Sequence, residues 1–320
     1  MAYKKQFDPD RVERFASADP TDGHARRAGD RAAESVYVYA DPIVLAVNVA
    51  LATDRPLLIR GASGSGKSSL ARNVAAKLGW RYHEAVVTSR TQARDLEWTF
   101  DAVRRLSDAA EGEVKPTQAY IQPGVLWWAF DATGARAQAG AAGVAATNPS
   151  GDDPAKDAMP AVVLIDEIDK ADPDVPNDLL VPVGSMTFTV ADTGQAVTSV
   201  AYDKPLLCIT TNEERDLPPA FLRRCVGLRL PDPDEDRLIQ IARAHFPDAD
   251  TRRARTIARQ FVSSDTGDLT PTRSQASTAE YLDAIQASLE LEVNPTPKNK
   301  TWQSILNAIV SKAADPTPRP

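Results

Sequence analysis

The stretch RPLLIRGASGSGKSS, residues 55–69, decides the fold. Its first half is a short, continuous apolar run, which is typical of a buried strand in a parallel sheet. Its second half is rich in glycine and leads into KSSLARNVAAKLG, residues 67–79, a helical pattern that ends at a glycine. A strand, a glycine-rich turn and a helix in this order match the pattern GxxxxGK followed by Ser or Thr, whose backbone amides surround a phosphate group.

The residues of this phosphate-binding loop (P-loop) divide by their chemistry. Gly61, Gly64 and Gly66 allow the backbone to wrap around a phosphate. Lys67 is expected to reach the β- and γ-phosphates of a nucleotide, and the Ser68 hydroxyl to complete the coordination of magnesium. The predicted nucleotide-binding residues of the loop are Gly61, Ala62, Ser63, Gly64, Ser65, Gly66, Lys67, Ser68 and Ser69.

A second motif, AVVLIDEIDK at residues 161–170, is an apolar strand that ends in acidic residues. In a parallel sheet, its carboxyl end lies at the same edge as the strand before the P-loop. Asp166 is predicted to orient magnesium, and Glu167 to align and deprotonate an attacking water. A solvated acidic loop is the alternative, but the combination with an upstream P-loop favours hydrolysis over binding alone.

Polar residues follow two more apolar stretches. Asn212 ends the run CITTN, where its amide would hold the attacking water near the γ-phosphate, and a helix cap is the alternative. The stretch LPPAFLRRC, residues 217–225, places Arg223 and Arg224 side by side with no acidic residue to neutralise them. We therefore expect their counter-charge elsewhere in the chain or on another copy of it.

The remaining patterns predict an α/β protein. We expect further strands at 81–87 and 204–212 and a hairpin at 186–200. One continuous core-facing helix is predicted at 94–110, and a mobile surface loop at 132–158, which is rich in Ala and Gly. Because strands alternate with helices, the predicted fold class is α/β, with a mostly parallel, doubly wound sheet.

The Pro-rich, acidic stretch LPDPDEDR predicts a domain boundary near residue 230. Only helical patterns follow it, at about 234–245, 251–263, 274–290 and 301–312. The expected organisation is an N-terminal extension at 1–35, a large domain at 36–230, a small all-helical domain at 231–312 and a disordered tail at 313–320.

Composition limits the classes of function. The 44 acidic and 37 basic residues give a net charge of -7, which argues against coating nucleic acid or anionic membranes. No apolar run approaches the roughly 18 residues that a membrane span needs, and the start does not have the pattern of a secretion signal. We therefore expect a cytoplasmic protein. Cys208 and Cys225 lack the spacing of a zinc site or a structural disulfide.

Together these motifs resemble the AAA+ ATPases, and most closely the MoxR branch, whose relatives include CbbQ/NorQ-type activators and the McrB motor. The resemblance covers residues 36–312 and rests on the P-loop, LIDEID, TTN, the paired arginines and the helical C-terminal part. YIQPGVLWWAFDA, residues 120–132, is similar to the segment after the helix-2 insert of that branch. The resemblance implies a P-loop domain followed by a helical lid, with ATP and Mg2+ as cofactors.

The resemblance also implies roles for single residues. Asn212 matches the sensor 1 residue, and Arg223 and Arg224 match arginine fingers that reach the nucleotide of a neighbouring subunit. Which of the two is the main finger stays open, because Cys225 replaces the phenylalanine that usually follows. LTPTRSQAS resembles the start of a lid helix with the sensor 2 arginine, here Arg273, for which an exposed surface arginine is the alternative.

The implied activity is hydrolysis of Mg-ATP at the subunit interfaces of a homo-oligomeric ring, expected to be a hexamer, that remodels or activates a protein client. Family practice suggests a von Willebrand A-domain protein as client, and neither nucleic acid nor a membrane is an expected partner. One alternative is a McrB-like motor that acts with a nuclease on DNA, against which the acidic balance counts. The other is an ATP-controlled scaffold or signalling switch with little turnover, against which Glu167 and the arginine pair count.

Overall fold

The computed structural model describes residues 3–10, 36–143, 154–199, 204–262 and 277–310. Within these ranges the chain forms two compact units. The larger unit contains residues 3–10, 39–60 and 71–229, and the smaller contains 36–38, 61–70 and 230–310.

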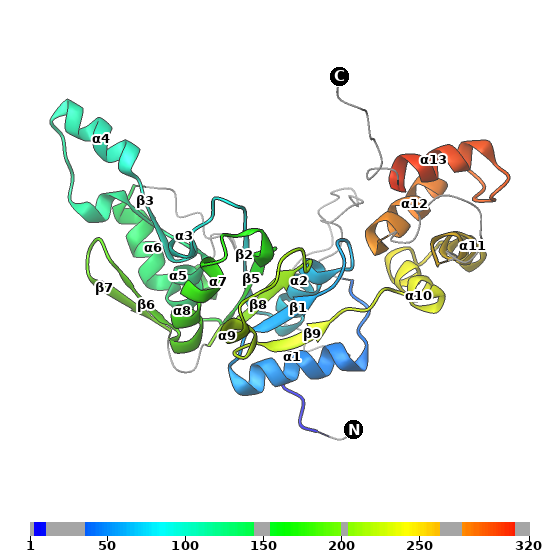
Figure 1. Ribbon diagram of the computed structural model, residues 1–320, viewed down its shortest axis with the longest axis horizontal. Helices are drawn as coiled ribbons and strands as arrows, with labels where there is room; N and C mark the ends of the chain where they lie inside the picture. Colours follow the sequence, from blue (N-terminus) through cyan, green and yellow to red (C-terminus); the bar gives the residue numbers. More distant parts are fainter. Residues whose placement is uncertain (1–2, 11–35, 144–153, 200–203, 263–276, 311–320) are drawn as a thin grey trace. The chain divides into compact units, whose positions relative to one another are not determined.

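A five-stranded sheet forms the centre of the larger unit (Figure 1). All of its strand pairs are parallel. Because β5 and β8 are buried along almost their whole length, they match central strands that are covered on both faces. The predicted parallel α/β fold is thereby confirmed. In order across the sheet, the strands are β2 (Arg81–Val86), β5 (Ala161–Asp166), β8 (Leu206–Thr211), β1 (Leu57–Arg60) and β9 (Val226–Arg229).

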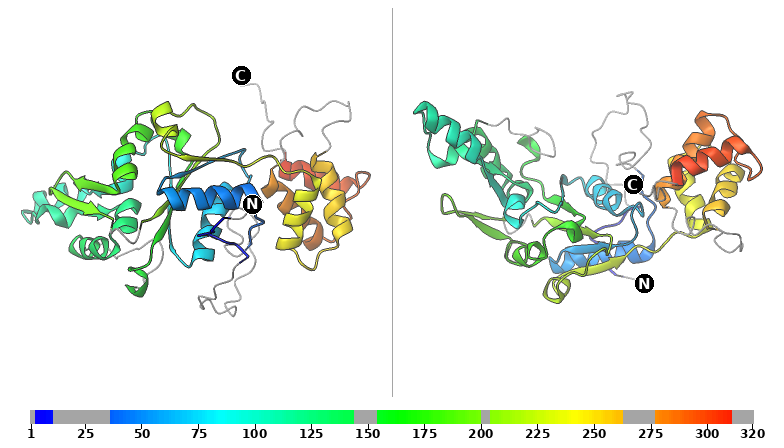
Figure 2. Two further views of the ribbon diagram at one scale, coloured as in Figure 1. Left: turned by 90° about the horizontal axis from the view of Figure 1, so that it is seen from below. Right: turned by 45° about the horizontal axis from the view of Figure 1, so that its top comes forward.

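Helices flank this sheet (Figures 1 and 2). The helix α1 (Asp41–Thr53) packs against β1 and β9, and α5 (Val125–Phe130) packs against β2 and β5. The helix α2 (Lys67–Leu78) follows the P-loop, as its sequence pattern predicts. On α1, the buried Asn48 side chain accepts a 2.8 Å hydrogen bond from the amide of Phe7 and donates a 2.7 Å bond to its carbonyl. This pair of bonds fixes the described N-terminal residues to the larger unit.

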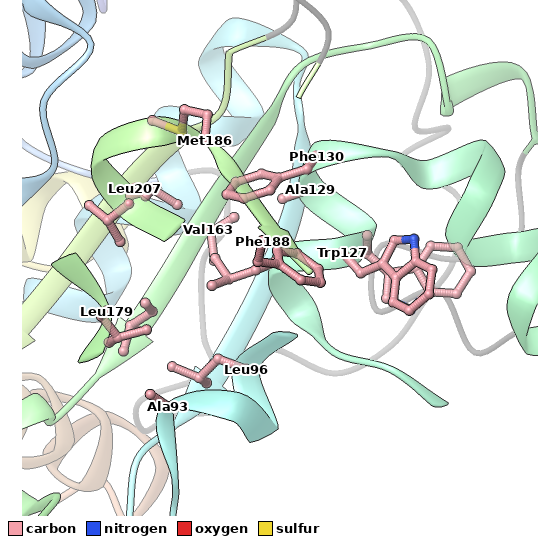
Figure 3. Packing of buried hydrophobic residues seen from close by; sticks show 14 of the residues in the cluster. Ala93, Leu96, Trp127, Ala129, Phe130, Val163, Leu179, Met186, Phe188 and Leu207 are labelled. Atoms are coloured by element: carbon pink, nitrogen blue, oxygen red, sulfur yellow. The ribbon is translucent and has the colours of Figure 1, made fainter. Parts of the chain in front are cut away.

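Phe188 lies at the centre of an aromatic cluster beside the sheet (Figure 3). Its ring stacks on Trp98 at a centroid distance of 5.9 Å, and lies 6.1 Å from Trp127 and 6.0 Å from Phe130. Phe188 belongs to β6 (Thr187–Val190), which pairs in antiparallel fashion with β7 (Gln195–Thr198), so the predicted hairpin is confirmed. The shorter elements of the larger unit are η1 (Thr117–Tyr120), η2 (Pro154–Lys156), η3 (Ile168–Lys170), α7 (Val175–Asp178), α8 (Leu180–Ser185) and α9 (Pro219–Leu222).

The predicted continuous helix at 94–110 is wrong. It is divided into α3 (Ala93–Glu97), β3 (Trp98–Phe100) and α4 (Ala102–Glu111). Aromatic residues favour strands, and β3 finds an antiparallel partner in β4 (Ile121–Pro123). The helix α4 buries none of its residues and extends away from the sheet (Figure 1). Its apolar positions therefore do not face the core.

The predicted mobile loop at 132–158 is wrong over its first part, because α6 (Ala132–Ala141) is a helix. Asp131 caps its start by accepting a 2.8 Å hydrogen bond from the amide of Gly134. The buried face of α6 consists mainly of alanines, which have the highest helix propensity and allow close packing. The prediction failed because it required large apolar residues in the helical pattern. Residues 144–153 of the predicted loop lie outside the described part of the chain.

In the C-terminal part of the smaller unit, the described residues 230–262 and 277–310 form helices and no strand, as predicted. Tyr281 and Trp302 are fully buried at the centre of its core, against Ile257 and Leu238. The indole of Trp302 donates a 3.0 Å hydrogen bond to the side chain of Gln260. Among the described helices of either unit, none has both the length and the apolar character needed to cross a bilayer. The four helices are α10 (Glu235–His245), α11 (Thr251–Val262), α12 (Thr278–Glu290) and α13 (Lys300–Val310).

Replacement of Phe188 by alanine tests the aromatic cluster. We expect Phe188→Ala to lower the free energy of unfolding by about 3–5 kcal/mol, because it removes a buried ring and leaves a cavity. Urea unfolding followed by tryptophan fluorescence measures the change. Leu106→Ala on α4 is the control, since Leu106 is 72% exposed and its loss should change stability by less than about 0.5 kcal/mol. Equal losses for the two variants would contradict the packing described here.

Glu97, at the end of α3, makes stability depend on pH. Burial, together with the nearby carboxylate of Asp178, raises the pKa of Glu97 from its ordinary 4.5 to about 7. The folded protein therefore holds a proton that the unfolded chain releases between these values, and the stability contributed by Glu97 falls as the pH rises through this window. Glu97→Gln should be more stable than the wild type at pH 8 and lose this advantage at pH 4, as measured by urea unfolding at both values. The same difference at both pH values would contradict this assignment.

Candidate functional site

Backbone geometry explains the glycines of the P-loop. Gly64 and Gly66 have φ angles of +71° and +90°, which residues with a side chain rarely adopt. A Cβ atom on Gly64 would also lie 2.5 Å from the Cβ of Ser277, the N-cap residue of α12 in the same unit. At its first residue, Gly61, the loop is joined directly to the end of β1. Glycine is therefore required at Gly64 by both conformation and space.

The lysine of the P-loop folds back over its own loop. Lys67 is 6% exposed, and its ammonium group donates hydrogen bonds of 2.9 Å and 2.8 Å to the carbonyls of Gly61 and Ala62. These contacts hold a buried positive charge inside the loop. Ser63 is exposed, and Ser68 and Ser69 are half-buried in the first turn of α2.

The donors of the loop fit a phosphate group. The Ser65 hydroxyl is buried and forms no hydrogen bond with any described residue. An unsatisfied buried hydroxyl is costly, and an anion within the loop would supply its partner. Backbone amides at the start of a helix and a lysine are the donors that recognise phosphate. The residues present therefore suit the nucleotide that the sequence predicts.

Asp166 and Glu167 lie at the carboxyl end of β5, and a threonine of the next strand joins them. The Thr210 hydroxyl donates a hydrogen bond to Oδ1 of Asp166 and accepts a 2.9 Å bond from the backbone amide of Glu167. Thr210 is fully buried in β8, which pairs with β5. Glu167 has a φ of +61°, an uncommon angle for a residue with a side chain. Its amide bond to Thr210 stabilises this turn.

The structure brings Glu167 and Asn212 together. The amide Nδ2 of Asn212 lies 3.3 Å from Oε1 of Glu167, and the ammonium of Lys170 lies 2.7 Å from Oε2. The hydrogen bond to Glu167 raises the pKa of Lys170 above its ordinary value. Both carboxylate oxygens of Glu167 therefore have a hydrogen-bond donor, which fixes the orientation of the group.

Asp169 fixes the backbone from which Asn212 projects. Its side chain is 3% exposed, and Oδ2 accepts hydrogen bonds of 3.1 Å and 2.9 Å from the amides of Asn212 and Glu214. Charged acceptors form stronger hydrogen bonds than neutral ones. Asp169 therefore anchors the segment after β8 to the segment after β5.

The arginine pair lies elsewhere in the larger unit, directly after α9 and before β9. Arg223 and Arg224 are both exposed, and within the described residues neither guanidinium makes a hydrogen bond or an ion pair. The anion that the sequence requires is thus not supplied by the described part of this chain.

Three polar residues at this site were missed by sequence reasoning: Thr210, Asp169 and Lys170. All three lie inside the motifs CITTN and LIDEIDK, so their position was a usable signal. Thr210 lies on β8, the strand that pairs with β5, at the level of Asp166 and Glu167, so its hydroxyl can bond both residues. Of the remaining predicted site residues, Arg273 lies outside the described residues.

Comparison with known proteins identifies the family. The model of the AAA domain (dynein-related subfamily) matches residues 56–225, more than half of the chain. The chain belongs to this family. It is thus an AAA+ P-loop protein, in agreement with the superfamily that its motifs resemble, and AAA+ proteins are generally ATP hydrolases. No curated protein matches the chain.

Solved structures of other AAA+ proteins are similar at low sequence identity. The Holliday junction branch migration motor RuvB of Thermotoga maritima is 15% identical, with a TM-score of 0.44 over 84% of this chain and 66% of that protein. Domain III of the replication initiation protein DnaA of Thermotoga maritima is 14% identical, with a TM-score of 0.43 over 86% of this chain and 95% of that domain. The chain thus spans about two thirds of the RuvB chain.

Removal of the Thr210 hydroxyl tests the link between the two strands. We expect Thr210→Val to lower the free energy of unfolding by about 1–3 kcal/mol, because the amide of Glu167 loses its acceptor. Thr210→Ser is the matched control, since it keeps the hydroxyl, and should be closer to the wild type. Urea unfolding measures both, and a valine variant as stable as the serine variant would contradict the proposed link.

Proposed function

We propose that the chain is a MoxR-like AAA+ ATPase, a cytoplasmic protein that hydrolyses Mg-ATP at the subunit interfaces of a ring. The observation that carries this proposal is the hydrogen-bonded group of Asp166, Glu167, Thr210 and Asn212 at the ends of β5 and β8. A chain that only bound nucleotide would not require a carboxylate oriented by two donors. Membership of the AAA family supports the same chemistry.

Each polar residue has a part in the proposed hydrolysis. The loop from Gly61 to Ser69 holds the phosphates, with Lys67 at the β- and γ-phosphates. Ser68 and Asp166 would hold Mg2+, which when bound neutralises charge on the phosphate oxygens. Glu167 accepts a proton from the attacking water, and the Asn212 amide keeps Glu167 and this water aligned.

The exposed arginine pair supports a ring in which subunits complete each other's sites. Arg223 and Arg224 would stabilise the negative charge that develops on the γ-phosphate of a neighbouring subunit. An arginine finger typically contributes a factor of about 10³–10⁵ in rate. We propose a hexamer, with Arg273 as the sensor of bound nucleotide and a protein client, such as a von Willebrand A-domain protein, that the ring remodels or activates.

Turnover of ATP as a function of protein concentration tests this proposal. The wild type should show a rate per subunit that rises with concentration, since isolated subunits lack the arginines of a neighbour. Arg224→Ala should bind ATP normally and lose this rise. Lys67→Ala should lose nucleotide binding, because the buried ammonium is the strongest phosphate donor of the loop.

Glu167→Gln is the matched variant for the chemical step, because it keeps the shape of the side chain and removes the base. It should bind ATP and fail to cleave it, and a pull-down in this state should retain the client. Full activity of strictly monomeric protein, or of Arg224→Ala, would overturn the ring mechanism. Stimulation of turnover by duplex DNA in place of a protein client would favour the DNA motor instead.

A further inference from the structure

Arg55 binds the backbone of the arginine pair itself and of the residue that follows it. It lies between α1 and β1, and its guanidinium donates to three successive carbonyls. Nε lies 3.1 Å from the carbonyl oxygen of Arg224, and Nη2 lies 3.1 Å from that of Cys225 and also bonds that of Arg223. These three carbonyls belong to the residues between the end of α9 and the start of β9, so Arg55 supplies hydrogen-bond donors to the backbone of this connection.

Pro56, the residue after Arg55, binds the same segment at its C-terminal end. The carbonyl of Pro56 accepts a 2.7 Å hydrogen bond from the amide of Val226, where β9 begins. From there the backbones of β1 and β9 pair in register, with Leu57 opposite Val226. The short connection between α9 and β9 is therefore bound at both of its ends by residues 55–57.

Arg55 is free to make these contacts because the adjacent acid has another partner. The carboxylate of Asp54 forms an ion pair with Lys204. An arginine can hold several carbonyls at once, since its planar group carries five N–H donors, whereas a lysine offers a single nitrogen. The set of hydrogen bonds at position 55 therefore requires an arginine side chain.

We propose that Arg55 is a positioning residue for Arg223 and Arg224, fixing the backbone from which they reach the nucleotide of the neighbouring subunit. This inference rests on the proposed function. In this proposal Arg55 does not contact the nucleotide. It fixes the backbone positions of Arg223 and Arg224, from which their exposed side chains extend. A displacement of about 1 Å at a catalytic group can cost about a hundredfold in rate.

Steady-state kinetics give the first test. Arg55→Ala should keep ATP binding and KM close to the wild type, while kcat falls by about a hundredfold and the rise of rate with protein concentration is lost. Arg55→Lys should recover only part of kcat, because one compact ammonium group cannot reproduce the separate positions of Nε and Nη2 against these carbonyls. Arg252→Ala is the control: Arg252 is an exposed arginine of α11, and its loss should leave kcat unchanged.

A mixing experiment separates positioning from damage to the subunit itself. Glu167→Gln subunits cannot hydrolyse ATP but present intact arginines. In an excess of them, Arg55→Ala subunits should turn over ATP at nearly the rate that wild-type subunits show in the same excess, because each site now faces an intact neighbour. Arg224→Ala subunits, whose own sites are also intact, should recover to the same extent.

The outcomes distinguish this inference from the function on which it rests. Wild-type kcat for Arg55→Ala, or no recovery in the mixture while Arg224→Ala recovers, would overturn the role of Arg55 and leave the ring mechanism in place. Full activity of Arg224→Ala alone would overturn the ring mechanism itself. If Arg55→Ala does not fold, Arg55→Lys is put through the same mixture and must show the same recovery.

Discussion

The parallel pairing of β5 with β8 is the constraint on which the candidate site depends. It brings the carboxyl ends of two strands far apart in the sequence to one edge of the sheet, where the Thr210 hydroxyl joins Asp166 to the amide of Glu167. Thr210 is fully buried, so its hydroxyl depends on these two partners, because a buried polar group without a partner is expensive. The positions of the site residues therefore follow from the pairing of the two core strands.

Charges around this edge have defined partners. Oδ2 of Asp169 accepts hydrogen bonds from two backbone amides. The carboxylate of Glu167 accepts one bond from the side-chain amide of Asn212 and one from the ammonium group of Lys170. The arginine pair differs, because its positive charges are exposed and lack an acid among the described residues. The contrast between the paired carboxylate of Glu167 and the exposed arginine pair is one reason for the proposal that a second copy completes the site.

Much of this arrangement could be predicted from the sequence, because the P-loop, the acidic strand and CITTN each combine a regular hydrophobic pattern with a few polar residues in fixed positions. The two failures have different physical causes. Residues 94–110 repeat apolar side chains at helical spacing, yet strand pairing by Trp98 to Phe100 overrides the pattern. The helix α6 was missed because alanines pack closely without contributing large apolar side chains. Tertiary contacts such as those of Arg55 join residues that are far apart in the sequence and produce no periodic sequence pattern, so they are visible only in the folded structure.

The position of β1 has one more consequence. One end of this strand continues into the P-loop of its own subunit, and the residues just before its other end, Arg55 and Pro56, hold the arginine pair. The four residues of β1, at about 3.3 Å per residue, form a strand roughly 13 Å long between the P-loop and the residues that bind the arginine pair. In the proposed ring, a shift of the loop on nucleotide binding would reach the arginines through this strand, and it would link the occupancy of one subunit to its action on the next.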